Sequence, residues 1–270
     1  MRVPFWKMHG AGNDFILMDD RALALPAENA DWLVSLARRR TGIGCEGIIL
    51  LQPATEADFR MRFYNPDGHS AEMCGNGARC AARLAVELGI APARMTLATD
   101  AGVLEALVTP DTVRLALPDP TEVRAYFDLS VDGAPISCGA ANTGVPHVVL
   151  ELQDLDEAPV MRLGPTIRNH PSFIPVGTNV NFVQRVDQHE LRVRTYERGV
   201  EAESGACGTG VTAAAIVMAL RQRVTPPVSV ATLSGDCLTI GFSMQGDRVS
   251  HVTLSGPAVH VYEGTLPLPG

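Results

Sequence analysis

The chain has 270 residues, of which 46% are hydrophobic and 19% are charged. A chain of this length buries about three quarters of its unfolded surface, so we expect it to fold without disulfides or metals, as one large domain or two of middle size. Its formal net charge is −8 and only 5% of its residues are aromatic. This balance argues against nucleic acid or an anionic membrane as a partner, because both bind through clustered positive charge.

Residues 1–7 contain no apolar stretch of signal-peptide length. The longest largely apolar run, 211–220, is shorter than the roughly 20 residues that span a bilayer. We therefore expect a cytoplasmic protein in which the six cysteines are reduced. Because no two of them have Cys-x-x-Cys spacing, we expect no bound metal.

Strand-like and helix-like segments mix in the first half of the chain. Short apolar runs predict strands at 15–18 and 47–51, and residues 59–64 alternate between apolar and polar side chains as a half-buried strand does. Helices are expected at 28–40 and 77–88, each ended by a glycine. Further strands are expected at 95–98, 103–108 and 113–117.

A break at 118–121 that contains two prolines interrupts this pattern, and we place a domain boundary there. The run 210–220 is almost wholly apolar, which predicts a helix buried on most sides, and a short helix is expected at 160–169. Strands are expected at 123–128, 146–152, 180–184, 191–196, 228–232, 238–242, 249–254 and 259–262. The second half thus repeats the mixture of the first.

Two glycine-framed cysteines occupy matching places in the two halves. Cys74 lies in Met-Cys-Gly-Asn-Gly at 73–77, and Cys207 lies in Ala-Cys-Gly-Thr-Gly at 206–210. Each is followed by a helix-like run, a strand and a turn with a glycine 28 residues after the cysteine, at Gly102 and Gly235. We infer that one supersecondary unit is used twice, with a thiol at the same corner of each copy.

A cysteine followed by Gly-x-Gly at a helix start favours a particular chemistry. The first backbone N–H groups of a helix have no internal partner and lie at the positive end of its dipole. Glycines allow a ligand to approach these groups, which bind carboxylates and phosphates well, and the same position favours the thiolate form of a cysteine. Two such thiols on opposite sides of one carbon could remove a proton from one face and return one to the other.

Other polar residues accompany these corners. Glu197-Arg198 follows a predicted strand and opens into the second thiol loop, where Arg198 could hold a carboxylate in a bidentate fork and Glu197 could accept an ammonium group. His147 precedes Cys207 by 60 residues, as Asp14 precedes the first cysteine. Asparagines 13, 65, 76, 179 and 181 lie beside glycine, proline or strand ends and suggest a polar pocket. No role is predicted for cysteines 45, 80, 138 and 237, and Cys80 is expected in the core.

Several segments, taken in order, resemble the diaminopimelate epimerase family over essentially the whole chain. They are Met-His-Gly-Ala-Gly-Asn-Asp-Phe at 8–15, Thr-Gly-Ile-Gly at 41–44, Asn-Pro-Asp-Gly at 65–68, Met-Cys-Gly-Asn-Gly-Ala-Arg at 73–79, Gly-Thr-Asn-Val-Asn-Phe at 177–182, Glu-Arg-Gly at 197–199 and Ala-Cys-Gly-Thr-Gly at 206–210. The two cysteine boxes together are the most specific part of this resemblance.

The resemblance implies a cofactor-independent isomerase that interconverts LL- and meso-diaminopimelate, in the route to lysine and cell-wall peptidoglycan. It implies an α/β (α+β) fold of two pseudo-symmetric lobes, 1–118 and 119–257, each a curved, mainly antiparallel sheet or barrel around a central helix. A last strand, at about 258–270, is expected to join the first lobe. The resemblance also implies an active site in the cleft between the lobes and a homodimer.

By position, the resemblance implies four catalytic residues: Cys74, Cys207, His147 and Glu197. It implies a substrate site formed by Asn13, Asn65, Gly75, Asn76, Asn179, Glu197, Arg198, Gly208 and Thr209. The two cysteines are the acid and the base, His147 and Glu197 assist proton transfer, and the N–H groups of 75–76 and 208–209 hold the reacting carboxylate. No cofactor is implied.

The chain departs from the family's pattern at a few positions. Val145 stands where many members have an asparagine that contacts substrate, Ser204 replaces a more usual threonine, and Gly47 stands where some members have a polar residue. Proline racemases and hydroxyproline epimerases share the paired cysteines, but their first box usually reads Met-Cys-Gly-His. An epimerase of another amino acid, such as histidine, and a non-catalytic dicarboxylate-binding protein remain open alternatives.

Overall fold

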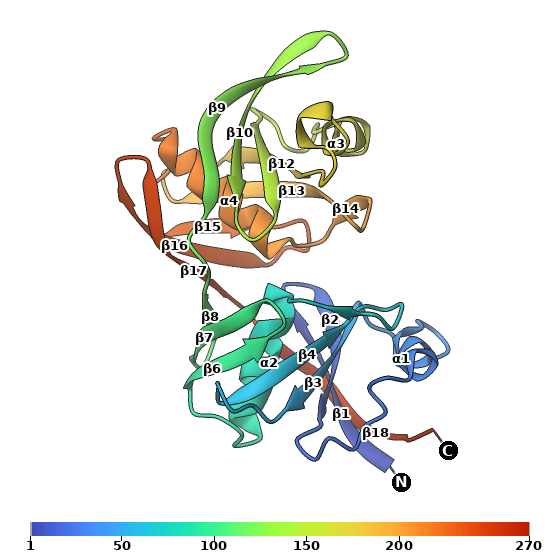
Figure 1. The fold of residues 1–270 in the computed structure, drawn as a ribbon. Helices are drawn as coiled ribbons and strands as arrows, with labels where there is room; N and C mark the ends of the chain where they lie inside the picture. Colours follow the sequence, from blue (N-terminus) through green and yellow to red (C-terminus); the bar gives the residue numbers. More distant parts are fainter. Residues whose placement is uncertain (1, 270) are drawn as a thin grey trace. The chain divides into compact units, whose positions relative to one another are not determined.

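The computed structural model describes residues 2–269, and the chain divides into two compact units. Unit 1 comprises Met1–Leu115 and Gly256–Gly270, and unit 2 comprises Ala116–Ser255. Both mix helices with mainly antiparallel strands, as Figure 1 shows, so the predicted α/β class is confirmed. The limits 1–118 and 119–257 for two epimerase lobes remain a prediction about function.

The strands of unit 1 pair in the order β18–β1–β2–β3–β4–β6–β7–β8. Their bounds are Arg2–Gly10 (β1), Asn13–Asp19 (β2), Gly47–Gln52 (β3), Phe59–Tyr64 (β4), Ser70–Ala71 (β5), Arg94–Thr99 (β6), Gly102–Val108 (β7), Val113–Ala116 (β8) and Val259–Pro267 (β18). The helices are Ala30–Ala37 (α1) and Gly75–Glu87 (α2). Pairs β2–β3 and β4–β6 are parallel, and the other pairs in this order are antiparallel.

The strands of unit 2 pair in the order β9–β10–β11–β12–β13–β15–β16–β17. Their bounds are Thr121–Val131 (β9), Ala134–Asn142 (β10), Pro146–Glu151 (β11), Asn179–Arg185 (β12), Glu190–Glu197 (β13), Ala202–Ser204 (β14), Val228–Ala231 (β15), Cys237–Gln245 (β16) and Arg248–Gly256 (β17). The helices are Val160–Arg168 (α3), the 3-10 turn Pro171–Phe173 (η1) and Gly208–Leu220 (α4). Parallel pairs are β11–β12 and β13–β15.

The two units therefore follow one topology. Strands β1, β2, β3, β4, β6 and β7 correspond in order and direction to β10, β11, β12, β13, β15 and β16. A helix connects each first parallel pair, α1 in unit 1 and α3 in unit 2, and a longer helix connects each second pair, α2 and α4. The repeat that the cysteine boxes indicate extends through the whole framework.

The helices α2 and α4 are central to their units (Figure 1). Helix α2 packs against β1, β2, β3, β4 and β7, and α4 packs against β9–β13, β15 and β16. Every residue of 210–219 is buried, which confirms the prediction for this apolar run. Ile216, Val217 and Met218 are fully buried, and such burial stabilises a fold by about 1.5–3 kcal/mol per side chain. The start of each helix is thereby fixed in place.

Four strands were not predicted from the sequence: the short β5 and β14, and the longer β1 and β10. β1 contains Pro4 and the buried Lys7, which interrupt any simple alternation. β10 is rich in small residues, and at Gly139 an added Cβ would lie 2.4 Å from Val217 of α4, so the helix approaches the strand too closely for a side chain. β1 and β10 each form because a neighbour pairs with them on both sides, and local composition does not report that.

The helix predicted at 28–40 is shorter in the structure. α1 begins after Asn29, whose side chain accepts a hydrogen bond from the Trp32 N–H at 3.0 Å, and it ends at Ala37. The last strand, Val259–Pro267, extends past the predicted 259–262, lies within 258–270 and pairs with β1 of unit 1. Among the described residues, no helix combines the length and apolar character needed to cross a bilayer.

Candidate active site

Each predicted catalytic cysteine caps the N-terminus of the central helix of its unit. Cys74 has φ −137° and ψ 119°, and Cys207 has φ −110° and ψ 105°, the extended geometry of a residue just before a helix. Each corner therefore presents the first N–H groups of a 13-residue helix at the positive end of its dipole. At Gly75, the first residue of α2, an added Cβ would meet no atom within 4 Å, so open space lies on that side of the residue.

In unit 1, Asn13 joins two other predicted site residues. Its Oδ1 accepts a hydrogen bond from Cys74 Sγ at 3.6 Å and from Asn76 Nδ2 at 3.2 Å. Its Nδ2 donates to Glu46. The amide oxygen of Asn13 is therefore turned toward the thiol, and Glu46 fixes that orientation from the other side.

A chain of ion pairs supports Asn13 from behind. Lys7 Nζ lies 2.6 Å from Asp14, and Arg39 Nη2 lies 2.8 Å from Asp14 and 3.6 Å from Glu46. Burial raises the pKa of Asp14, but hydrogen bonds from Lys7 and Arg39 outweigh it and hold that pKa below its ordinary value. Arg39 thus connects an ionised Asp14 to the Glu46 that holds Asn13. The sequence analysis missed Glu46, because a lone glutamate beside a glycine resembles solvated surface.

In unit 2, the second corner is surrounded by threonine hydroxyls. Cys207 is 7% exposed, and its Sγ lies 3.5 Å from Thr209 Oγ1. Thr143 Oγ1 donates to the Thr209 carbonyl at 2.9 Å, which ties the helix start to the loop between β10 and β11. Thr212 Oγ1 donates to the Gly208 carbonyl at 2.8 Å within the helix. The predicted residue Thr209 therefore lies in contact with the second sulfur.

The ends of β12 and β13 bring a further group of predicted residues together. Asn179, the first residue of β12, accepts at Oδ1 from the Arg198 N–H at 2.8 Å and donates from Nδ2 to the Pro146 carbonyl at 3.2 Å. Arg198 Nη1 donates to the Val176 carbonyl at 3.0 Å. Glu197 is the last residue of β13. Asn179 therefore fixes the backbone at Arg198, next to Glu197.

His147 is 1% exposed and is the second residue of β11. Its Nδ1 lies 3.1 Å from Nδ2 of Asn181, a buried residue inside β12. Burial, reinforced by the positive charge of Arg198, lowers the pKa of His147 from 6.5 to about 3. The imidazole is therefore neutral at ordinary pH.

Three of the cysteines without a predicted role have thiols that stay protonated at ordinary pH. Burial raises the pKa of Cys45 to about 11, of Cys80 to about 12 and of Cys138 to about 11. Cys80 is fully buried, as predicted, while Cys237 is exposed. Cys45, Cys80 and Cys138 therefore form part of the core, unlike the two cysteines at the helix starts.

The remaining predicted positions are placed as follows. Asn65 begins the predicted turn at 65–68, its N–H donates to the His69 carbonyl at 2.9 Å, and it is half-buried. Asn181 lies inside β12, within the strand predicted at 180–184. Thr195 was missed, although its place among the inward positions of β13 marks it as a polar residue in a core row.

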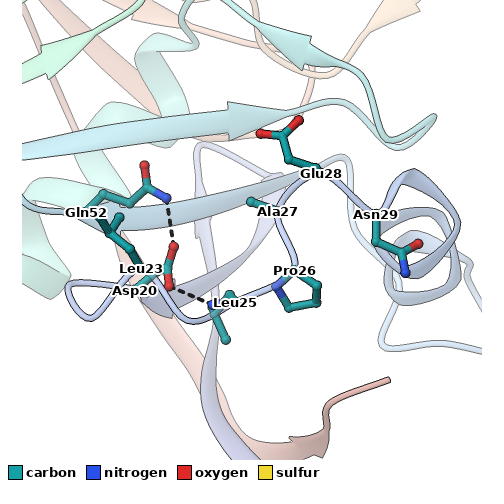
Figure 2. Close-up of a pocket in the computed structure, with 8 residues that line it drawn as sticks. All are labelled: Asp20, Leu23, Leu25, Pro26, Ala27, Glu28, Asn29 and Gln52. Atoms are coloured by element: carbon teal, nitrogen blue, oxygen red, sulfur yellow. Dashed lines mark hydrogen bonds between the residues drawn. The ribbon is translucent and has the colours of Figure 1, made fainter. Parts of the chain in front are cut away.

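A separate pocket of about 490 Å³ lies on unit 1 (Figure 2). It is lined by Asp20, Leu23, Leu25, Pro26, Ala27, Glu28, Asn29 and Gln52. The Asp20 carboxylate accepts from the N–H groups of Ala24 and Leu25 and from Gln52 Nε2 at 2.7–3.0 Å. This carboxylate holds the loop against β3, and the pocket contains none of the predicted site residues.

The fold is similar to that of several solved structures. These include a phenazine biosynthesis protein of the PhzF family from Bacillus anthracis, with a TM-score of 0.72, 16% identity and coverage of 99% of this chain and 100% of that one. A hydroxyproline epimerase from Agrobacterium vitis has a TM-score of 0.68, 20% identity and coverage of 98% and 92%. The duplicated α/β architecture with a central helix in each unit is therefore that of the PhzF and proline-racemase-like class of folds.

Sequence comparison is more specific. The family model described as diaminopimelate epimerase matches residues 5–120 and 139–261. Diaminopimelate epimerases of Aquifex aeolicus and Chlorobaculum tepidum are 44% and 40% identical over 98% and 97% of this chain and 98% and 100% of their own lengths. The chain belongs to the diaminopimelate epimerase family.

Proposed function

We propose that this chain epimerises LL-diaminopimelate to meso-diaminopimelate without a cofactor, with Cys74 and Cys207 as its acid and base. The observation that carries the proposal is the repeated corner, in which a cysteine caps the central helix of each unit in a chain of this family. The relatives from Aquifex aeolicus and Chlorobaculum tepidum that are named diaminopimelate epimerase match this chain almost from end to end. The product serves the synthesis of lysine and peptidoglycan.

The first requirement is to stabilise negative charge. The α-hydrogen of an amino acid is barely acidic, so charge that develops on the substrate carboxylate must meet fixed donors. In the proposal, the N–H groups of 75–76 and 208–209 bind that carboxylate from both helix starts. Removal of one such donor from an enzyme site typically slows the reaction roughly 100- to 1,000-fold.

The second requirement is a pair of proton transfers. One sulfur is a thiolate and removes the α-proton to become a thiol, while the C–H electron pair remains on the substrate. The other sulfur is a thiol, gives its proton to the opposite face and becomes a thiolate. Atoms and electrons balance without an oxidant or reductant, and the two sulfurs exchange roles in the reverse direction.

The third requirement is to orient a substrate with two amino-acid ends. Arg198 offers a planar fork for a carboxylate and Glu197 an acceptor for an ammonium group. Asn13, Asn65 and Asn179 supply amide donors and acceptors around them. Support comes from the hydrogen bonds that already hold Asn13 beside Cys74 and Asn179 beside the Arg198 backbone.

The proposal is tested by deuterium uptake. The purified chain is incubated in heavy water without added cofactor, with LL-diaminopimelate, proline, hydroxyproline or histidine, and the Cys74→Ala, Cys207→Ala double variant is the control. We expect label at Cα of diaminopimelate and formation of the meso isomer only with the wild type. Label on another amino acid alone would favour the alternative that Val145 leaves open. Binding of diaminopimelate without any label would favour a binding protein.

The proposal extends to assembly and location. We propose a homodimer in the cytoplasm, where reducing conditions keep both catalytic thiols reduced. The edge strand β18 exposes Val259, Val261 and Tyr262, which are 41%, 55% and 45% exposed, and such apolar side chains suit an interface. Sedimentation equilibrium tests the assembly, with twice the chain mass expected and the single chain mass contradicting it.

A further inference from the structure

The strands beneath the two cysteine corners carry different residues at matching register positions. In unit 1, Ile49 of β3 pairs with Phe63 of β4, and Phe15 of β2 pairs with Gly47 at the start of β3. An added Cβ at Gly77, three residues after Cys74, would lie 2.9 Å from Ile49 and 3.4 Å from Phe15. The first corner thus rests on an apolar set, in which the rings of Phe15 and Phe63 meet edge-on at 6.2 Å.

Unit 2 has a polar set at the corresponding places. Asn181 of β12 pairs with Thr195 of β13, and His147 of β11 pairs with the first residue of β12. An added Cβ at Gly210, three residues after Cys207, would lie 2.4 Å from Asn181 Oδ1. His147, Asn181 and Thr195 are 1%, 0% and 3% exposed. Polar side chains therefore replace packed hydrocarbon directly beneath the second corner.

The hydrogen bonds of this set fix the orientation of the Asn181 amide. Nδ2 lies 2.9 Å from the backbone carbonyl of Val148, which can only accept, so the amide nitrogen must face it. Thr195 Oγ1 donates to Oδ1 at 2.9 Å on the opposite side of the amide. An inverted amide would place two oxygens against each other in a buried site and leave both without a donor.

This orientation determines where the histidine carries its proton. Because Nδ2 of Asn181 donates, Nδ1 of His147 at 3.1 Å must accept. A neutral imidazole then has its proton on Nε2. Among the described residues, Nε2 is buried and has no hydrogen-bond partner, so it is a donor that awaits an acceptor.

We propose that Asn181, itself oriented by Thr195 and the Val148 carbonyl, is a positioning residue that holds His147 as a neutral Nε2–H donor on the Cys207 side of the active site. The inference rests on the proposed function and deepens it, since a neutral donor stabilises anionic charge there without adding a second cation beside Arg198. The Phe15–Ile49–Phe63 set gives Cys74 no such donor. The two thiols then work in unlike surroundings on one duplicated frame.

Nitrogen-15 NMR of the histidines at pH 7 tests the proposal on the intact wild type, with the His147→Phe spectrum identifying the His147 signals. We expect an unprotonated Nδ1 and a protonated Nε2, with no averaging between tautomers. A protonated Nδ1 or an imidazolium would overturn the proposal. The Asn181→Asp variant replaces the donor by an acceptor, so we expect the imidazole proton of His147 to move from Nε2 to Nδ1.

Kinetics separate positioning from a purely structural role. For Asn181→Asp we expect kcat to fall at least 10-fold with KM within threefold, and for Thr195→Val a fall of about threefold that Thr195→Ser restores. The control is Thr99→Val, which removes a comparable buried hydrogen bond, 2.8 Å long, to the Gly102 carbonyl in unit 1. We expect Thr99→Val to leave kcat and the His147 spectrum unchanged.

Besides the spectra, two kinetic results would contradict the positioning role of Asn181, and a third result would bear only on the epimerase reaction. A folded Asn181→Asp variant with wild-type kcat, or a fall in kcat for Thr99→Val equal to that for Thr195→Val, would overturn the positioning role. A wild type without epimerase activity would overturn the proposed function, and the tautomer spectra would still decide whether Asn181 fixes the proton.

Discussion

The two cysteine corners share a backbone and differ in what surrounds it. Both cysteines occupy the N-cap position of a 13-residue helix that starts with Gly-x-Gly, on equivalent parts of one topology. The Cys74 thiol donates to Asn13, which also accepts from Asn76, and it lies above the apolar set of unit 1. The Cys207 sulfur lies beside the Thr209 hydroxyl, above the polar set of unit 2. The duplicated units therefore share the backbone geometry of the helix start, while the side chains around the two thiols differ.

The fifth residue after each cysteine shows the same divergence. Arg79 is fully buried, donates to the Asn76 side chain at 2.9 Å and to the carbonyl of Pro257 at 3.3 Å, and so connects α2 to the segment before β18. Its counterpart Thr212 donates to the Gly208 carbonyl in its own helix at 2.8 Å. A buried cation therefore follows the first cysteine by five residues, and a threonine occupies the corresponding place after the second.

The largest effect is expected when either thiol is removed. Cys74→Ala and Cys207→Ala each delete an obligatory proton carrier, so we expect epimerisation to fall by roughly 100- to 10,000-fold or to become undetectable. The assay is the rate of meso-diaminopimelate formation by chiral chromatography. If either folded variant kept most of its activity, the two corners would not be equal partners in the reaction.

The next effect compares Gly210, which lies above the polar set of unit 2, with Gly77, which lies above the apolar set of unit 1. Gly210→Ala places a Cβ 2.4 Å from Asn181 Oδ1 and 3.3 Å from Cys207 Sγ, and we expect a loss of about 1–3 kcal/mol in unfolding free energy together with most of the activity. Gly77→Ala meets the flexible end of Ile49 at 2.9 Å, and alanine favours helix by about 1 kcal/mol, so we expect almost no loss. Denaturant unfolding measures both losses in unfolding free energy. A larger loss for Gly77→Ala than for Gly210→Ala would contradict the difference between the apolar and the polar set.

A smaller effect is expected in the pH dependence of stability. His147 has a pKa of about 3 when folded and 6.5 when unfolded, so between these values the unfolded chain binds one more proton and the unfolding free energy falls as pH falls. The slope from this side chain is about 1 kcal/mol per pH unit. In His147→Phe, which copies Phe15, we expect that slope to disappear between pH 6 and 4.5, whereas the carboxylates contribute equally in both proteins. Parallel curves in that window would contradict a buried neutral histidine.

The smallest effect is expected in native thiol labelling. Burial raises the pKa of Cys45, Cys80 and Cys138 to about 11–12, so their thiolate fractions at pH 8 are very small. We expect a maleimide followed by mass mapping to leave these three unmodified in the native protein and to modify all six cysteines after denaturation. Native labelling of Cys80 as fast as that of the exposed Cys237 would contradict the packing of α2.

Much of this organisation is predictable from the chain, and what is missing has physical causes. The boxes around Cys74 and Cys207 predict the helix corners because glycines and a long apolar run are local signals. β10 was not predicted because its small residues are chosen by the approach of α4, which is a tertiary constraint. Asn181 was named among the asparagines that suggest a polar pocket, but its hydrogen bonds to His147 and Thr195 were not predicted. These partners come from neighbouring strands and leave no pattern in either segment alone.

The most direct test of two sulfurs acting on opposite faces is the position of label after a single turnover in heavy water. The account predicts that meso-diaminopimelate formed from the LL isomer carries one deuterium at the inverted Cα, while the recovered LL isomer carries none, because the proton is removed by one sulfur and delivered by the other. Product that keeps its original hydrogen, or equal label in recovered substrate and product, would contradict the account.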